Sequence, residues 1–226
     1  LRAINDFAAM SLAACLLGDD DVTVVGAPSP ATVGSVPRQT FAVVGPGTGL
    51  GVGALLVRAG RAEALASEGG HVAFAPRDAR EIELLRCLAV RFGRVSCERL
   101  LSGEGLVNLH SALAEIDGVA VDALRPNEIT ARADSGSDAC CVLAVGMFCE
   151  LLGAVAGDFV LAFGAWDGVY LTGGLTPRLL LWLGQGGFRR RFDDKGRFAE
   201  RLAAVPVLAV THAEPGLLGC AARAVL

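Results

Sequence analysis

The stretch Pro46-Gly47-Thr48-Gly49-Leu50-Gly51-Val52-Gly53 lies between two short runs that favour β-strands, residues 40–45 and 54–58. The order strand, glycine turn, strand predicts a β-hairpin, whereas dinucleotide-binding folds place their glycines between a strand and a helix. Glycines leave no Cβ to keep a phosphate from the backbone N–H groups, and Thr48 adds a hydroxyl donor. The Lys of a P-loop is missing, which disfavours a Walker-type NTPase. A tight hairpin that needs positive φ and binds nothing explains the stretch equally well.

The rest of the chain alternates between predicted strands, turns and helices. Residues 18–40 are dense in turn formers and are predicted to form a loop. An amphipathic pattern predicts a helix over 79–92, and Pro215 is expected at the first position of a closing helix. Further helices are expected over 7–17, 106–115, 136–155 and from Thr176, and further strands over 62–66, 159–163, 168–171 and 205–210. This alternation predicts an α/β fold with a mixed sheet.

The composition of the 226 residues is that of a globular protein, with 53% hydrophobic and 19% charged residues. The net charge of −4 argues against a nucleic-acid partner, because phosphate neutralisation needs clustered Lys and Arg. The most apolar stretch, 140–166, contains Glu150 and Asp158, so we predict buried core and no membrane partner. Seven cysteines without a CxxC pair predict a reducing, cytoplasmic location and no zinc site.

The segment Glu68-Gly69-Gly70-His71 places a carboxylate and an imidazole three residues apart across two glycines. Both groups can then converge on one small polar ligand, such as a pair of sugar hydroxyls. The alternative is a solvated turn with a structural His, which is the commoner situation. A metal site is a weaker interpretation, because His110 and His212 are remote and no second His or Cys falls at ligand spacing.

Other polar positions allow both a structural and a functional interpretation. Asn5-Asp6 precedes a predicted helix and fits an N-cap, although Asp6 could also act as a general base. Glu98 and Glu104 are by default surface carboxylates. Gly173-Gly174 follows a predicted hairpin and precedes a predicted helix, so it fits close approach of a nucleotide as well as a plain turn.

Taken together, these segments resemble bacterial ATP-dependent glucokinases, in which similar motifs occur in the same order along essentially the whole chain. The motifs that carry the resemblance are Ile4-Asn5-Asp6-Phe7, Gly45-Pro46-Gly47-Thr48-Gly49-Leu50-Gly51, Glu68-Gly69-Gly70-His71-Val72-Ala73-Phe74-Ala75-Pro76, Cys97-Glu98-Arg99-Leu100-Leu101-Ser102-Gly103-Glu104-Gly105-Leu106, Thr172-Gly173-Gly174, Asp194-Lys195-Gly196-Arg197-Phe198 and Pro215-Gly216-Leu217-Leu218-Gly219. The related repressor, open reading frame and kinase family follows its Glu-x-Gly-His element with a cysteine-rich zinc motif. Here Val72-Ala73-Phe74-Ala75-Pro76 follows instead, which favours the glucokinase branch and predicts no structural zinc.

The resemblance implies an actin-like, ribonuclease-H-like sugar kinase fold, with a large glucose- and nucleotide-binding domain over 17–210 and a small-domain remnant over 1–16 and 211–226. It implies transfer of the γ-phosphoryl of ATP, with Mg²⁺, to the 6-hydroxyl of glucose, a reaction of glycolysis, and a homodimeric protein. The implied roles are Asp6 as catalytic base and substrate ligand, Asn5, Glu68, His71 and Glu98 as sugar ligands, Gly47, Thr48 and Gly49 as phosphate ligands, and Gly173 and Gly174 beside the adenosine.

The sequence also departs from this family. The family carries a first phosphate loop of the form Asp-x-Gly-Gly-Thr-Asn near its N-terminus, and no such segment occurs in these 226 residues. By comparison with the family, we expect roughly the first third of the enzyme to be missing. The chain also opens at Leu1 without an initiator Met. Two alternatives therefore stay open, a catalytically incomplete sugar-binding fragment or pseudokinase, and a kinase for another hexose such as mannose or fructose.

Overall fold

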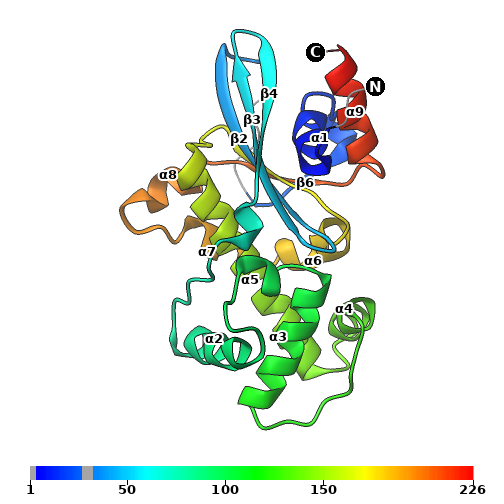
Figure 1. Ribbon diagram of the computed structural model, residues 1–226, viewed down its shortest axis with the longest axis vertical. Coiled ribbons are helices and arrows are strands. Elements are labelled where there is room, and N and C mark those ends of the chain that lie inside the picture. The colour runs from blue at the N-terminus through cyan, green and yellow to red at the C-terminus, as the bar shows by residue number, and fades with distance from the viewer. Residues whose placement is uncertain (1–3, 27–32, 226) are drawn as a thin grey trace.

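The computed structural model describes residues 4–26 and 33–225, and the strands of this part form a six-stranded sheet (Figure 1). The strand order is β1-β6-β5-β2-β3-β4. β5 runs parallel to both of its neighbours, β2 and β6, whereas the other pairs are antiparallel. The strands are β1 (Val22–Val24), β2 (Arg38–Pro46), β3 (Leu50–Arg58), β4 (Arg61–Ser67), β5 (Gly168–Leu171) and β6 (Val207–Val210). The predicted α/β class with a mixed sheet is confirmed.

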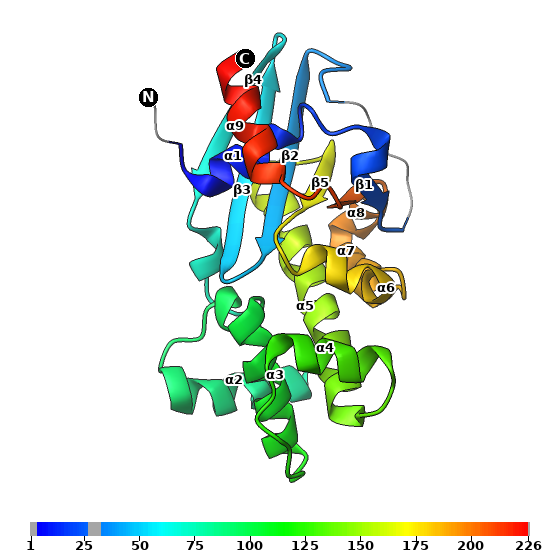
Figure 2. The same ribbon diagram turned by 90° about the vertical axis from the view of Figure 1, so that its right-hand side faces the viewer.

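Helices cover both faces of this sheet and build a second layer of structure beyond one end of it (Figures 1 and 2). α1 and α9 lie on one face, and α5 and α7 lie on the other. α3 and α4 pack against α5 beyond the end of the sheet, and α2 packs against α3. The helices are α1 (Asp6–Ala13), α2 (Ala79–Phe92), α3 (Gly103–Ile116), α4 (Pro126–Asp134), α5 (Ala139–Phe163), α6 (Leu180–Leu183), α7 (Gly187–Asp193), α8 (Ala199–Ala203) and α9 (Pro215–Val225).

β2 and β3 form the predicted hairpin, with Arg38 opposite Arg58 and Pro46 opposite Leu50. Successive side chains of a strand point to opposite faces, and β2 uses both faces for the core. Phe41 and Val43 pack in the cluster that includes Leu12 of α1, whereas the intervening Ala42 and Val44 belong to the larger cluster around α5. Burial on both faces explains why this strand is a continuous apolar run in the sequence.

The two ends of the chain lie side by side, because α1 and α9 pack against each other on the sheet (Figure 2). A Cβ atom on Gly219 would lie only 1.7 Å from the carbonyl oxygen of Ala9, so the helices cross at backbone contact distance. This contact brings the segments 1–16 and 211–226 together where they are described. The division into these ends and a body over 17–210 stays a prediction.

α5 is the central helix of the molecule. It is long and apolar enough to cross a membrane, but core helices of soluble proteins pass the same test, and 56% of its most apolar window is buried. Phe148, Leu152 and Val160 are completely buried, so the prediction of buried core for this stretch is confirmed. The helix ends at Gly164, whose φ of 64° lets its N–H bond to the carbonyl of Val160.

The strand predicted over 159–163 is wrong, because α5 continues to Phe163. Its apolar residues face buried neighbours on several sides, so the segment shows no clear helical stripe and resembles a buried strand. The predicted loop 18–40 contains the short strand β1 and the start of β2, while its part 27–32 lies outside the described residues. α4 was not predicted, and the helix expected from Thr176 is a 3₁₀ turn followed by the short α6.

Candidate active site

A cleft of about 780 Å³ opens where the β2–β3 turn, the start of α1 and the turn after β5 meet. It collects residues that are far apart in the sequence, including all of the predicted site residues except His71. The residues that line it are Asn5, Asp6, Phe7, Met10, Gly45, Gly47, Thr48, Gly49, Leu50, Gly51, Ser67, Glu68, Glu98, Gly103, Glu104, Pro126, Gly173, Gly174, Leu175 and Arg178.

Two backbone hydrogen bonds of Gly47 hold the β2–β3 turn. The N–H of Gly47 donates to the carbonyl of Gly49 at 2.8 Å, and the carbonyl of Gly47 accepts from the N–H of Gly103 at 2.8 Å. Gly103 is the first residue of α3, so the turn is fixed against the start of that helix. Thr48, at the tip, remains exposed to solvent.

Packing, and not positive φ, requires Gly49 and Gly51 in this turn, which corrects the structural alternative considered from sequence. None of Gly47, Gly49 and Gly51 has positive φ. A Cβ on Gly49 would lie 2.5 Å from Oε2 of Glu98, and one on Gly51 would lie 2.1 Å from the ring of Phe7. The missing side chains therefore let Glu98 and Phe7 approach the backbone of the hairpin.

Glu98 lies in a one-turn 3₁₀ helix (Cys97–Arg99) and connects two parts of the cleft. Its Oε2 accepts a hydrogen bond from the N–H of Leu50 at 2.9 Å. Its other oxygen, Oε1, lies 3.8 Å from Nδ1 of His71. His71 itself is mostly exposed and does not line the cleft, so its contact with the site runs through Glu98.

The turn that carries Glu68 and His71 packs tightly on β3. A Cβ on Gly70 would lie 2.0 Å from the carbonyl oxygen of Leu50, and one on Gly69 would lie 2.8 Å from Val52. The two glycines are therefore buried against the strand, while Glu68 and His71 on either side of them stay exposed. The N–H of His71 donates to the carbonyl of Glu68 at 3.0 Å, which closes the turn.

Asn5 and Asp6 begin α1 and face the cleft. Oδ1 of Asn5 accepts from the N–H groups of Phe7 and Ala8, both at 3.0 Å, so the N-cap interpretation is confirmed for Asn5. Asp6 is the first helical residue and keeps an exposed carboxylate, one oxygen of which accepts from the N–H of Phe7 at 2.8 Å. The helix N-terminus also stabilises its negative charge.

Gly173 and Gly174 follow β5, but the expected hairpin before them does not exist, because α5 fills the segment predicted as its first strand. Gly173 has φ of 85°, and a Cβ there would lie 2.5 Å from the carbonyl oxygen of Pro46. A Cβ on Gly47 would face the N of Gly174 at 3.8 Å. The two glycine turns therefore lie next to each other and form one wall of the cleft.

The sequence did not single out two charged residues of the cleft as site residues. Glu104, in the first turn of α3, was treated as a surface carboxylate. Arg178, in the one-turn 3₁₀ helix Thr176–Leu179, is exposed in the cleft and forms no ion pair within the described part of the chain. Arg178 also lines an adjoining cavity of about 700 Å³ against α4. No local motif marks Arg178, because only the packing of β5 beside β2 brings it to the cleft.

The two adjacent glycine turns and the carboxylate-rich cleft lie on a mixed α/β sheet, and this is the fold of solved sugar kinases. The chain belongs to the glucokinase family: the family model described as Glucokinase matches residues 1–225. A glucokinase of Xylella fastidiosa is 50% identical over 225 residues, which are 99% of this chain and 66% of the relative. The chain thus spans about two thirds of the length of the curated relatives that it matches.

Solved structures show the same fold. The structure of a glucokinase from an Antarctic psychrotroph matches with a TM-score of 0.89 and 35% sequence identity, over 97% of this chain and 67% of that one. A glucokinase of the repressor, open reading frame and kinase family from Streptomyces griseus, solved with glucose and AMPPNP, matches with a TM-score of 0.60 and 21% identity, over 96% of this chain and 65% of that one. The second match bears on the fold alone.

Proposed function

We propose that the chain binds glucose and ATP in this cleft and transfers the γ-phosphoryl group of ATP to the 6-hydroxyl of glucose. The observation that carries the proposal is that one cleft contains Asp6, Thr48, Glu98 and Gly173, which the sequence holds far apart. Membership of the glucokinase family supports the same reaction, because the curated relatives are glucokinases.

Glucose would be held by the polar groups on the Glu68 and Glu98 side of the cleft. Each carboxylate can accept hydrogen bonds from two neighbouring hydroxyls, which suits a sugar with several equatorial OH groups. The side-chain oxygen of Asn5 accepts the N-cap hydrogen bonds of α1. The NH₂ group of the same side chain can donate a hydrogen bond to a sugar oxygen. His71 would act through Glu98, whose carboxylate it approaches.

Asp6 would be the catalytic base, because it is an exposed carboxylate in the cleft at the start of α1. The oxygen of the 6-hydroxyl attacks the γ-phosphorus and forms the new O–P bond. Its proton passes to the carboxylate of Asp6, the bond between the γ-phosphorus and the bridging oxygen breaks, and ADP leaves. Positioning supplies most of the rate enhancement in such reactions, so alignment of Asp6 with the sugar hydroxyl is the main requirement.

ATP would lie along the wall formed by the two glycine turns. The backbone N–H groups and the hydroxyl at Gly47-Thr48-Gly49 can donate to phosphate oxygens, and Gly173-Gly174 allows the adenosine to approach the backbone closely. Mg²⁺ fits this cleft, because Glu104, next to the residue that bonds Gly47, offers hard carboxylate oxygens. The ion, bound together with the ATP phosphates, supplies charge neutralisation.

A second candidate is favoured by the length of the chain. Because it spans about two thirds of its relatives, it could bind glucose and still lack groups needed for turnover, as a catalytically incomplete fragment. A different hexose, such as mannose or fructose, is a further alternative for the same site. A cytoplasmic location and a homodimer belong to the same proposal and rest on the family resemblance.

Isothermal titration of the 226-residue chain with glucose, mannose and fructose, followed by a coupled assay for the sugar 6-phosphate with Mg-ATP, tests the proposal. We expect saturable binding with glucose preferred, and turnover. Binding without turnover would favour the incomplete fragment, and tighter binding of mannose or fructose would reassign the substrate. No binding of any hexose to a folded chain would contradict the sugar site.

A further inference from the structure

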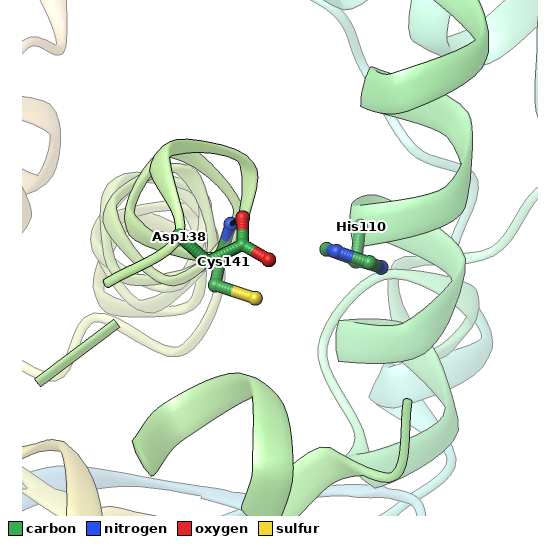
Figure 3. A group of neighbouring side chains, drawn as sticks. All are labelled: His110, Asp138 and Cys141. Carbon is green, nitrogen blue, oxygen red and sulfur yellow. Dashed lines mark hydrogen bonds between the residues drawn. The ribbon is translucent and has the colours of Figure 1, made fainter. Parts of the chain in front are cut away.

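His110, Asp138 and Cys141 meet in the helical part of the molecule, outside the residues that line the cleft (Figure 3). His110 is in α3, Asp138 is the N-cap of α5, and Cys141 is in the first turn of α5. One possible ligand atom from each residue, a ring nitrogen, a carboxylate oxygen and a sulfur, lies within 4.8 Å of the other two. Figure 3 shows the imidazole directed toward the carboxylate and the thiol.

His110 has a polar atom that the protein does not satisfy. The residue is 1% exposed, and its Nε2 has no hydrogen-bond partner within the described structure. A buried polar atom without a partner costs free energy, so native proteins pair such atoms with protein, water or an ion.

The carboxylate of Asp138 combines an N-cap on one oxygen with a longer ion pair on the other. Its Oδ1 accepts the N–H groups of Cys140 and Cys141 at 2.9 and 3.1 Å as the N-cap of α5. Its Oδ2 lies 3.6 Å from a guanidinium nitrogen of Arg132, which also pairs with Asp122 at 3.3 Å. The N-cap bonds hold the carboxylate in place, as hydrogen bonds around a metal ligand commonly do.

We propose that His110, Asp138 and Cys141 bind a divalent transition-metal ion of the zinc type, with water as the fourth ligand. The combination of imidazole nitrogen, thiolate sulfur and carboxylate oxygen suits Zn²⁺, and three protein ligands are enough for a four-coordinate site. The thiol of Cys141 loses its proton to solvent as the sulfur–metal bond forms.

Such an ion would tie α3 to the start of α5. Both helices also pack against α4, and Pro126 of α4 lines the cleft. The ion would therefore stabilise the helices next to the proposed sugar site without contacting the sugar. The spacing of the sequence predicted no metal site, because His110 and Cys141 form no local motif and only the packing of α3 on α5 joins them.

Titration of the metal-free chain with Co²⁺, followed by absorbance, tests the site, because a Co²⁺–thiolate bond gives a charge-transfer band and tetrahedral Co²⁺ absorbs strongly. We expect one equivalent to bind and Zn²⁺ to displace it. Cys141→Ser should remove the thiolate band, and His110→Gln should weaken binding about tenfold or more. Cys149→Ser, at a buried thiol farther along α5, is the matched control and should bind as the unaltered chain does.

Absence of binding, or an unchanged thiolate band in Cys141→Ser, would overturn the proposal. If Cys141→Ser does not fold, X-ray absorption of the unaltered chain with one equivalent of Zn²⁺ replaces it. We then expect sulfur and imidazole nitrogen in the first coordination sphere, and their absence would be equally contradictory. A crystal structure with a water on Nε2 of His110 and no ion after zinc soaking would also refute the site.

Discussion

Oε2 of Glu98 accepts a hydrogen bond from the backbone N–H of Leu50 at 2.9 Å, which joins a residue of the proposed sugar site to the end of the glycine turn. The absence of a side chain on Gly49 makes this contact possible. A sugar that orders the carboxylate of Glu98 would therefore also order the turn that we propose to bind the ATP phosphates. Glucose, through Glu98, and the ATP phosphates would then both act on the backbone of the β2–β3 turn.

We expect Glu98→Gln to weaken glucose binding about 10- to 100-fold, because hydrogen bonds to a charged acceptor contribute about 1.5–3 kcal/mol. ATP binding should weaken as well, since the amide is a poorer acceptor for the N–H of Leu50. Titration calorimetry with each substrate measures both effects. Glu104→Gln, which removes a charge from the same cleft without touching Leu50, is the control for glucose, and equal affinities in all three proteins would argue against the role of Glu98.

Asp6→Ala should reduce the turnover of the chain by about 100-fold or more, the usual contribution of a general base. Glucose affinity should change far less, because Asn5, Glu68 and Glu98 remain in the cleft. A coupled assay for glucose 6-phosphate and calorimetry of glucose binding separate the two quantities. A variant that turns over at nearly the original rate would remove Asp6 as the base.

Arg178→Ala should weaken ATP binding about tenfold, since charge-assisted hydrogen bonds to phosphate are among the stronger polar contacts. The prediction rests on the exposed guanidinium in the cleft, which has no ion-pair partner among the described residues. Glucose affinity should be unchanged. Titration of ATP, and then of glucose, into both proteins makes the comparison. A loss of affinity for glucose alone would contradict a contact between Arg178 and the ATP phosphates.

Gly51→Ala should destabilise the chain by about 1–3 kcal/mol, the typical cost of overpacking. A Cβ at this position would lie 2.1 Å from the ring of Phe7, so α1 must shift away from the hairpin. Gly174→Ala, where a Cβ meets nothing within 4 Å, is the matched control and should unfold with the original midpoint. Urea unfolding measures both, and equal midpoints would mean that the α1 contact is easily displaced.

Local sequence patterns predicted the helices and strands that have a clear amphipathic period or a glycine turn. The amphipathic helix over 79–92 coincides with α2. The hairpin around Gly47 is present, but its strands extend to Pro46 and from Leu50, into the segment expected between them. The buried segment 159–163 was misassigned, because a helix surrounded by apolar neighbours loses the periodicity that distinguishes it from a strand.

Contacts between distant segments could not be predicted from local patterns. The N–H of Leu50 bonds a carboxylate 48 residues away, and Arg178 reaches the cleft only because β5 lies beside β2. The positive-φ alternative for Gly49 and Gly51 was wrong for the same reason, since the atoms that exclude a Cβ belong to the distant residues Glu98 and Phe7. The spacing of residues along the chain did not predict that these residues share one cleft, and the family resemblance did.

A crystal structure of this chain with glucose and a non-hydrolysable ATP analogue is the most direct measurement. We predict the 6-hydroxyl within about 3 Å of the Asp6 carboxylate. We also predict the Glu68 and Glu98 carboxylates on the other sugar hydroxyls and the terminal phosphate against Gly47-Thr48-Gly49. Glucose bound with its 6-hydroxyl away from Asp6, or the phosphates away from this turn, would contradict the proposal that one cleft brings both substrates together.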